Sequence, residues 1–256
     1  MIVALTRPVS SSIATCELTH LDREPIDLAR ARAQHEAYER ALASVGCRVI
    51  SLPELPDNPD AVFVEDAAIV LDEVAVLTRP GAPSRRGEVD AIADSLAAFR
   101  HAERINEPGT LDGGDVLRLG RTLYVGLTSR TSAAGVEQLR AIVSTLGYAV
   151  ETVDVAGALH LKTAVTQVGP NWILANPEWV DVAQFPGYDA LVVDPAEPFA
   201  ANAVYVNGAV VHSTAFPRTQ DTLRAHGVRV IGVDASELAK AEGGVTCCSL
   251  LFDVIN

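Results

Sequence analysis

The 256-residue sequence predicts an α/β protein built from five similar units that form a ring. Three observations support this prediction. First, the chain repeats the order of strand, turn, strand, loop and helix. Second, the residues that open the units are separated by 46, 48, 42 and 45 positions; they are Asp66, Asp112, His160, Asn202 and Cys247. Third, the last unit is incomplete, and the N-terminal segment resembles its missing strand.

The first predicted elements are a strand, a loop and a helix. Apolar residues predict a strand over residues 3–6, and residues 13–24 have no clear period, which is typical of an irregular loop. From Pro25 onward apolar residues recur at steps of three and four, and Gly46 follows them, so we expect a helix between these two positions. Residues 49–52 predict the next strand, which a proline-rich stretch ends.

The next two units repeat most completely. Each contains two short apolar strands joined by a two-residue turn, followed by a helix with one apolar face. The first unit has strands at 67–71 and 74–78 and a helix face of Val89, Ile92, Leu96 and Phe99. The second has strands at 116–119 and 122–125 and a helix face of Val136, Leu139, Val143 and Leu146.

The third and fourth units are shorter. The third is less complete and ends on a strand at residues 172–175. The fourth contains Asn207-Gly208, a strong hairpin signal because both residue types tolerate positive φ. A strand at 209–212 and a short helix from Pro217, ending at Gly227, complete the fourth unit.

The fifth unit has a single strand, at residues 248–254. Residues 3–8 resemble residues 76–80, which form the second strand of the first unit and the Arg-Pro pair after it. We therefore expect the N- and C-terminal strands to pair and close the ring. Closure would bring the five leading residues together at the centre.

The composition indicates a folded protein of a reducing compartment. Hydrophobic residues make up 48% of the chain, enough for a sizeable core in one large domain or two small ones. Apolar runs stay far below the roughly 18 residues of a membrane span, and the first residues do not resemble a secretory leader. The four cysteines, two of them adjacent, match no disulfide framework. We expect a soluble cytoplasmic protein.

The charge favours small cationic molecules as partners. The chain has 20 basic and 33 acidic residues, a formal net charge of −13. That charge repels phosphate backbones and anionic lipid, so neither nucleic acid nor a membrane surface is an expected partner. The sequence leaves the oligomeric state open.

The leading residues combine a thiol, an imidazole and two carboxylates. An imidazole beside a thiol can activate the thiol as a nucleophile and then protonate a leaving group. Carboxylates bind cations, and a guanidinium matches paired carboxylates in bidentate geometry. Because carboxylates raise the pKa of a nearby thiol, we expect a bound cation to help form the thiolate.

Each motif taken alone also has a purely structural interpretation. The cysteine pair could be small core residues, the Asp-Gly-Gly-Asp motif at 112–115 a turn, and His160 a hydrogen-bonded structural histidine. The shared spacing favours a common site instead. The spacing does not distinguish Cys247 from Cys248.

The sequence predicts neither a metal site nor a cofactor site. Cys247, Cys248, His160 and Asp112 are acceptable zinc ligands, but CxxC and HxxxH spacings are missing and adjacent cysteines rarely bind one ion together. Zinc, if it binds, is expected to inhibit. The chain has no P-loop and no GxGxxG motif after a strand, so nucleotide use is not expected.

At these motifs the sequence resembles the dimethylarginine dimethylaminohydrolases, members of the guanidine-modifying superfamily. The similar blocks extend over nearly the whole chain, in the family's order: PDAVFVED at 59–66, TRPGAPSRR at 78–86, TLDGGDV at 110–116, LHLK at 159–162, AN at 201–202 and TCCS at 246–249. The resemblance implies the pentein fold, a five-bladed α/β propeller with pseudo-fivefold repeats closed by the terminal strands. It also implies one catalytic domain over residues 1–256.

The resemblance implies roles for the reactive residues. Cys247 would be the nucleophile and Cys248 its non-essential neighbour. His160 would act as general acid and base, and Asp112 would orient it and contact the guanidinium. Some members of the family carry Glu where Asp112 stands, which preserves the carboxylate.

The resemblance also implies which residues hold the substrate. They are Asp66 for the guanidinium, with Glu65 in support; Arg85 and Arg130 for the α-carboxylate; and Asp60, with the backbone carbonyls of Leu18 and Ala241, for the α-amine. Residues 15–22 match a loop that acts as a lid in the family. The lid and the leaving-group pocket would decide which amine is expelled.

The implied reaction is hydrolysis of asymmetric dimethylarginine or monomethylarginine to L-citrulline and dimethylamine or methylamine. It passes through a covalent S-alkylthiouronium on the cysteine and requires no metal or organic cofactor. One alternative is a related cysteine hydrolase or deiminase acting on another guanidino or ureido amino acid, such as arginine or citrulline. An alternative of another class is a non-catalytic binder of cationic amino acids.

Overall fold

The computed structural model describes residues 1–254, and within that range the strands form five three-stranded sheets. The strands are β1 (Ile2–Thr6), β2 (Arg48–Ser51), β3 (Ala68–Val70), β4 (Val74–Leu77), β5 (His101–Arg104), β6 (Val116–Leu119), β7 (Thr122–Leu127), β8 (Ala149–Asp154), β9 (Val165–Gly169), β10 (Trp172–Ala175), β11 (Asp189–Val192), β12 (Ala203–Val206), β13 (Ala209–Ser213), β14 (Arg229–Val233) and β15 (Leu250–Asp253). The sheets are β15-β1-β2, β3-β4-β5, β6-β7-β8, β9-β10-β11 and β12-β13-β14. In each, the first two strands are antiparallel and the third runs parallel to the middle one. The five sheets match the five predicted units.

The prediction of two strands per unit is wrong, because every sheet has a third strand. The third strands are β2, β5, β8, β11 and β14, of which the sequence predicts only β2. In β5 His101, Glu103 and Arg104 are exposed, and in β11 Asp189 and Val192 are exposed. An edge strand packs only in part against the rest of the protein, so it needs no continuous apolar run and leaves little periodic signal.

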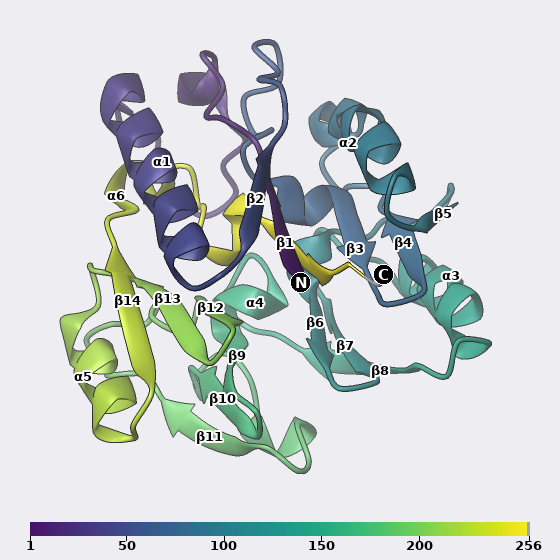
Figure 1. The fold of residues 1–256 in the computed structure, drawn as a ribbon. Coiled ribbons are helices and arrows are strands. Elements are labelled where there is room, and N and C mark those ends of the chain that lie inside the picture. Colours follow the sequence, from purple (N-terminus) through teal and green to yellow (C-terminus); the bar gives the residue numbers. More distant parts are fainter. Residues whose placement is uncertain (255–256) are drawn as a thin grey trace.

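Helices connect the middle strand to the third strand in four of the sheets, as a parallel connection requires a crossover. The helices are α1 (Leu28–Ser44), α2 (Gly87–Ala97), α3 (Ala133–Ser144), α4 (Leu161–Ala164), α5 (Pro217–Ala225) and α6 (Ser236–Ala239). Figure 1 shows α1, α2, α3 and α5 on the outside of the strands. Between β10 and β11 the chain forms only a 3₁₀ turn, Val182–Gln184, which agrees with the less complete third unit.

Two local predictions have different outcomes. Helix α1 begins at Leu28 rather than at Pro25, because Asp27 is the N-cap and its side chain accepts a hydrogen bond from the Arg30 amide at 3.0 Å. An N-cap acceptor satisfies an amide that has no partner inside the helix. The hairpin at Asn207-Gly208 is confirmed, with φ angles of 49° and 74° between β12 and β13.

The two terminal strands pair, as the repeat predicts. β1 is antiparallel to β15, with Val3 opposite Phe252 and Leu5 opposite Leu250. Figure 1 shows the purple β1 and the yellow C-terminal strand side by side. The predicted strand start at residue 248 is wrong: β15 starts at Leu250, because residues Thr246–Cys248 form a 3₁₀ turn.

The first strands of all five sheets contribute to the wall of one cavity of about 220 Å³. Its lining includes Ile69, Leu117, Thr166, Tyr205 and Leu250, one from each first strand. The five sheets therefore face a common space. The turns that precede these strands lie at one end of it, where Glu65 and Lys162 also line the cavity.

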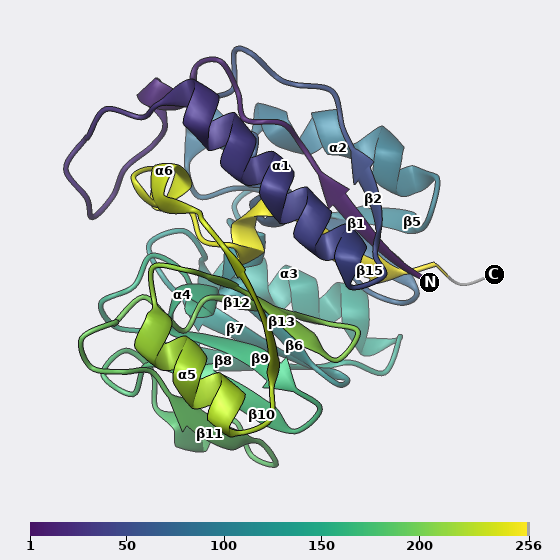
Figure 2. The ribbon, with the colours of Figure 1, turned by 60° about the vertical axis from the view of Figure 1, so that its left-hand side comes forward.

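The loop before α1 lies beside α6, as Figure 2 shows. The Asp27 amide donates to the Glu237 carboxylate at 2.9 Å, and Lys240 Nζ donates to the Pro25 carbonyl at 3.0 Å. These contacts hold the loop next to the segment that leads to Cys247.

Across residues 1–254, every helix is too short or too polar to cross a membrane. The predicted single domain extends to residue 256, and its last two residues lie outside the described range.

We expect Leu5→Ala to lower the free energy of unfolding by about 2–5 kcal/mol, because it removes fully buried side-chain atoms from the strand that joins the chain ends. Leu127→Ala, on β7 with a side chain that is 39% exposed, should change it by no more than about 0.5 kcal/mol. Urea denaturation measures both. Equal losses would contradict the importance of packing around β1.

Candidate active site

The predicted reactive residues lie in short turns that directly precede the first strands. Such a turn ends a loop on a rigid sheet, so its side chains are held at one end of the central space. Asp66 is in the 3₁₀ turn Val64–Ala67 before β3, Asp112 comes directly before the 3₁₀ turn Gly113–Asp115 and β6, His160 is the N-cap of α4, and Cys247 is in the 3₁₀ turn before β15.

The near-constant spacing reflects the repeated units and not one repeated position within them. Asp66 lies two residues before its strand, Asp112 four and His160 five. Asn202 and Cys247 lie one and three residues before theirs. The five residues therefore occupy different positions in the turns that precede their strands.

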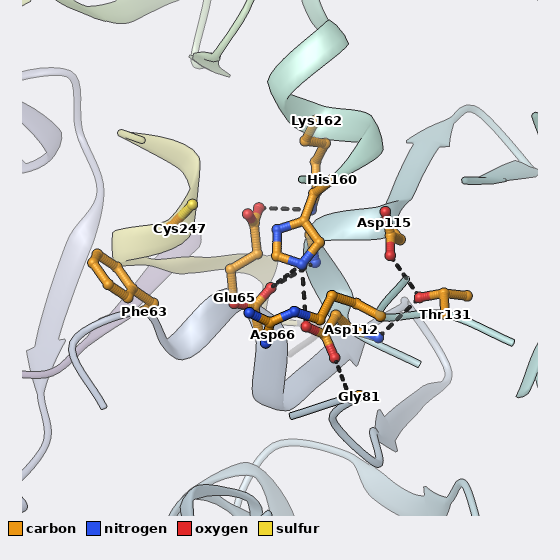
Figure 3. Close-up of polar contacts among 12 residues, drawn as sticks. Phe63, Glu65, Asp66, Gly81, Asp112, Asp115, Thr131, His160, Lys162 and Cys247 are labelled. Carbon is orange, nitrogen blue, oxygen red and sulfur yellow. Dashed lines mark hydrogen bonds and ion pairs between the residues drawn. The ribbon is translucent and has the colours of Figure 1, made fainter. Parts of the chain in front are cut away.

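His160 and two carboxylates form a compact buried cluster (Figure 3). His160 Nε2 lies 3.1 Å from Asp112 Oδ2 and 4.0 Å from Asp66 Oδ1. Backbone amides hold both carboxylates in place: Gly81 donates to Asp112 Oδ1 at 2.8 Å and Gly114 donates to Asp66 Oδ1 at 3.0 Å. The three predicted residues are thus brought together.

The cluster favours a protonated imidazole. Burial alone would lower the pKa of His160, but the charges of Asp66 and Asp115 and the hydrogen bond to Asp112 outweigh it and raise that pKa to about 9. Burial alone would raise the pKa of Asp66, but the positive charges of His160 and Arg85 lower it to about 2. At neutral pH His160 can therefore donate a proton.

Cys247 lines the same small cavity as His160 and Asp66, whereas Cys248 packs in the core cluster with Tyr38. The cavity measures about 20 Å³, room for roughly one water molecule. The structure therefore separates the two sulfurs, which the sequence spacing does not. Cys247 is the thiol that can reach a group bound beside His160.

The Cys247 thiol is not activated by its protein surroundings. Burial, followed by the negative charges of Glu65 and Asp66, raises its pKa to about 12. The Gly244 amide, 3.4 Å from the sulfur, and the Thr246 hydroxyl oppose this shift only in part. A positive charge in the cavity would favour the thiolate.

Glu65 supports the turn that carries Cys247. Its carboxylate accepts hydrogen bonds from Lys162 Nζ at 2.6 Å and from the Thr246 hydroxyl at 2.8 Å. Asn202 adds two bonds to the same threonine, donating to its hydroxyl at 2.9 Å and accepting from its amide at 3.1 Å. Asn202, a leading residue, thus supports the turn that carries Cys247 rather than facing the imidazole, and a direct substrate contact by Glu65 stays a prediction.

Five of the predicted substrate-binding residues line the cavity with Cys247: Asp60, Asp66, Arg85, Arg130 and Ala241. Leu18 packs against the core cluster that contains Ala241. Arg85 is buried and donates to Asp66 Oδ2 at 2.5 Å and to Glu88 Oε2 at 2.9 Å. Burial raises the pKa of the Asp60 carboxyl, although the Arg85 charge opposes it.

The predicted lid loop is held by residues that line the cavity. The Glu17 amide donates to Asp60 Oδ2 at 3.1 Å, and Arg130 Nη2 donates to the Thr19 hydroxyl at 2.9 Å. Glu242 accepts the amide of Thr19 at 3.0 Å. It accepts those of the next two residues at 2.5 and 2.7 Å.

Sequence reasoning misses Glu242. Its φ is 59°, a left-handed conformation that few residues with a side chain adopt. An acidic residue beside two glycines is typical of a surface turn, so no sequence signal marks it as the acceptor for three lid amides. Lys162 and Thr246 lie in sequence blocks similar to those of the family, but only their hydrogen bonds to Glu65 in the structure show what they do.

Asp66, Asp112 and His160 place one donor atom each within 4.8 Å of one another, a grouping that could admit a metal ion. Here those atoms bond to protein groups: His160 to Asp112, and Asp66 to Arg85 and the Gly114 amide. Cys247 is not part of this group, which is the one found within that distance among residues 1–254. The arrangement fits an acid–base network, and the lack of a metal requirement stays a prediction.

Comparison with known proteins identifies relatives over the whole length of the chain. A family model described as "N,N dimethylarginine dimethylhydrolase, eukaryotic" matches residues 16–184. The N(G),N(G)-dimethylarginine dimethylaminohydrolase of Pseudomonas aeruginosa is 38% identical, with 98% of each chain covered. The protein of the same name from Streptomyces coelicolor is 40% identical over 96% of this chain and 95% of its own.

Solved structures agree with these relatives. A mutant of the Pseudomonas aeruginosa enzyme complexed with citrulline has a TM-score of 0.93 at 37% identity and covers 97% of this chain and 98% of its own. The N-terminal domain of ArgZ, a cyanobacterial arginine dihydrolase, has a TM-score of 0.88 at 21% identity over 98% and 97%, which shows the shared fold alone. The sequence similarity over the full length and the matching fold show that this chain belongs to the dimethylarginine dimethylaminohydrolase family.

Proposed function

We propose that this chain hydrolyses Nω-methylated L-arginine to L-citrulline and dimethylamine or methylamine. The observation that carries the proposal is the cavity at which the Cys247 thiol, the His160 imidazole and the Asp66 carboxylate meet. The names of the relatives support the same reaction. One of the similar solved structures holds citrulline, the expected amino-acid product.

In the proposed complex, Asp66 and Asp112 bind the substrate guanidinium. Both are buried carboxylates within 4.0 Å of His160, so the guanidinium carbon would lie between the imidazole and the thiol. Contacts at the other end of the substrate orient it. They are Arg85 and Arg130 for the α-carboxylate, and Asp60 with the carbonyls of Leu18 and Ala241 for the α-amine.

The substrate's positive charge forms the nucleophile in this mechanism. It offsets the negative charges that raise the Cys247 pKa, so the thiol loses its proton to solvent and the thiolate attacks the guanidinium carbon. Protonated His160 gives its proton to the departing methylated amine as the C–N bond breaks. The product of this step is an S-alkylthiouronium on Cys247 with a neutral His160.

Water completes the reaction. Neutral His160 takes a proton from a water molecule, whose oxygen attacks the thiouronium carbon, and collapse of the adduct breaks the C–S bond. L-citrulline leaves, Cys247 returns as thiolate or thiol, and His160 is protonated again. Asp112, bonded to His160 at 3.1 Å, stabilises the imidazolium at both ends of the cycle. The side chains named supply every step without a cofactor.

We further infer that the five sheets are blades of a closed propeller, the pentein arrangement, and that residues 1–256 form one catalytic domain. The pairing of β1 with β15 and the cavity shared by the first strands support closure. All four cysteines are free, which supports the cytoplasmic location that we propose. The proposed partner is one small cationic guanidino amino acid.

Turnover of a substrate panel tests the reaction itself. We expect asymmetric dimethylarginine and monomethylarginine to be hydrolysed with a kcat/KM orders of magnitude above that of arginine or citrulline. Cys247→Ser should abolish turnover, and Cys248→Ser should keep it, because Cys247 faces His160 and Cys248 packs in the core. Citrulline and the released amine are measured together.

Two outcomes of the panel would reject the proposal. Faster turnover of arginine or citrulline would indicate a deiminase or another ureido hydrolase. Tight binding of methylarginine without any citrulline release would indicate a binder of cationic amino acids.

Alkylation of Cys247 tests its activation by a cation. The rate with neutral iodoacetamide should rise about tenfold per pH unit from pH 6 to 9, because the thiol pKa is about 12 and the thiolate is scarce throughout this range. A cationic haloacetamidine should react much faster at pH 7 and depend less on pH. Intact mass follows both, with Cys247→Ser as the blank. Identical pH profiles for the two reagents would contradict activation by the cation.

Arg130→Met should raise KM about 10- to 100-fold and change kcat little, because it removes a bond to the substrate carboxylate far from the reacting carbon. A methylated agmatine, which lacks that carboxylate, should show the same kcat/KM with both forms. Arg140→Met, an exposed change on α3, is the control. An equal loss of kcat/KM with both substrates would show that Arg130 does not act through the substrate carboxylate.

A further inference from the structure

Asp115 is a third carboxylate near His160, after Asp66 and Asp112, and neither the sequence motifs nor the proposed mechanism gives it a role. It is fully buried at the end of the 3₁₀ turn that follows Asp112. Its Oδ1 accepts the Leu161 amide at 3.0 Å. Its Oδ2 accepts the hydroxyls of Thr128 at 2.7 Å and Thr131 at 2.6 Å. Its two oxygens therefore bond to different segments: one to the start of α4, the other to the loop between β7 and α3.

The threonine side of this network reaches Asp112. A threonine hydroxyl has one proton, and Thr131 donates it to Asp115. The same hydroxyl oxygen is then oriented to accept the Asp112 amide, at 3.2 Å. Figure 3 shows this path from Asp115 through Thr131 to Asp112. Thr128 repeats the arrangement by accepting the Arg130 amide at 3.1 Å.

The other side of the network reaches His160. The Leu161 amide belongs to the peptide bond that joins His160 to α4, so the bond from Asp115 holds the backbone from which the imidazole projects. One carboxylate therefore holds the backbones of both members of the His160–Asp112 pair. It holds them from opposite oxygens, which restrains the distance between them.

We propose that Asp115 is a positioning residue that fixes the His160 imidazole against Asp112 and adds negative charge beside it; this inference rests on the proposed function. A purely structural carboxylate would need only enough hydrogen bonds to offset its burial. Asp115 instead accepts the amide that directly follows His160, and it reaches the Asp112 amide through Thr131 and the Arg130 amide through Thr128. Substrate itself makes no contact with Asp115 in this arrangement.

The charge of Asp115 also acts on the imidazole. Burial raises the pKa of Asp115 to about 6, with His160 and the two threonines opposing that rise. Asp115 is in turn one of the charges that raise the pKa of His160. The other charged groups that face His160 are Asp66 and Asp112, with Arg85 paired to Asp66. Removing the charge of Asp115 should therefore lower the His160 pKa and leave these neighbours in place.

Asp115→Asn tests the proposal because it keeps the side-chain shape, removes the charge and places an amide donor where a threonine hydroxyl now donates. We expect kcat for asymmetric dimethylarginine to fall about 10- to 100-fold, as for a displaced catalytic group, with KM changed less than threefold. Thr131→Val should lose rate in the same way. Thr131→Ser, which retains the hydroxyl, should keep most of the wild-type kcat.

Titration of His160 by NMR gives a readout that does not depend on turnover. The signal is assigned by its loss in His160→Gln, and its midpoint should move to lower pH in Asp115→Asn. Glu197→Gln is the matched control, since Glu197 is a buried carboxylate that accepts the Arg218 and Thr219 amides at the start of α5. It should lower thermal stability without moving kcat or the His160 midpoint.

The inference is wrong if Asp115→Asn and Thr131→Val lower the melting temperature but keep the wild-type kcat and His160 midpoint. If Asp115→Asn does not fold, the rate difference between Thr131→Val and Thr131→Ser decides the question, and equal rates reject the proposal. If the wild-type protein hydrolyses no methylated arginine, the proposed function fails on its own. The NMR midpoints still decide whether Asp115 acts on His160.

Discussion

A histidine buried among three carboxylates is the constraint on which the rest of the site depends. Burying a charge is unfavourable unless partners compensate it. Here the imidazolium compensates the acids, and backbone amides complete their hydrogen bonding. The packing leaves no room for a side chain at Gly114, where an added Cβ would lie 2.8 Å from both Asp66 Oδ1 and His160 Nδ1. The glycines of the Asp-Gly-Gly-Asp motif are thus part of the cluster's geometry.

The same surroundings keep the Cys247 thiol protonated. Burial, Glu65 and Asp66 raise the pKa of Cys247, and Asp66 is also one of the carboxylates that keep His160 protonated, so the protein without substrate has a proton donor and a neutral thiol. A bound guanidinium would change this balance because it would place a further positive charge beside the thiol. Substrate recognition and activation of the thiol would then be a single electrostatic event. Neutral amino acids could occupy the cavity without creating the thiolate.

The topology explains how residues from distant parts of the chain meet. Pairing of β1 with β15 anchors the strand that follows Cys247, while Glu65 and Asn202 fasten the preceding threonine from two other sheets. The cavity of about 20 Å³ is far smaller than an amino acid, so it must widen before substrate can enter, and Glu17 of the predicted lid loop is part of its wall. Glu242 accepts hydrogen bonds from three amides of the loop at residues 15–22. Because Glu242 lies in the segment before Cys247, these bonds tie the position of the loop to that segment.

The periodic pattern predicted five units and the Asn-Gly pair predicted the hairpin at 207–208, and the structure has both. The same period, with the family-like blocks, singled out the reactive residues, whose catalytic roles stay predictions. Sequence reasoning missed four of the five third strands, since edge strands such as β5 need no apolar run, and it misplaced the start of α1, where Asp27 is the cap and Pro25 is not. The folded arrangement was needed to see which sulfur lines the cavity with His160, that Asn202 supports a turn, and that Asp115 and Glu242 hold other segments in place. Those roles depend on hydrogen bonds between residues far apart in the chain, and no spacing within one segment records such contacts.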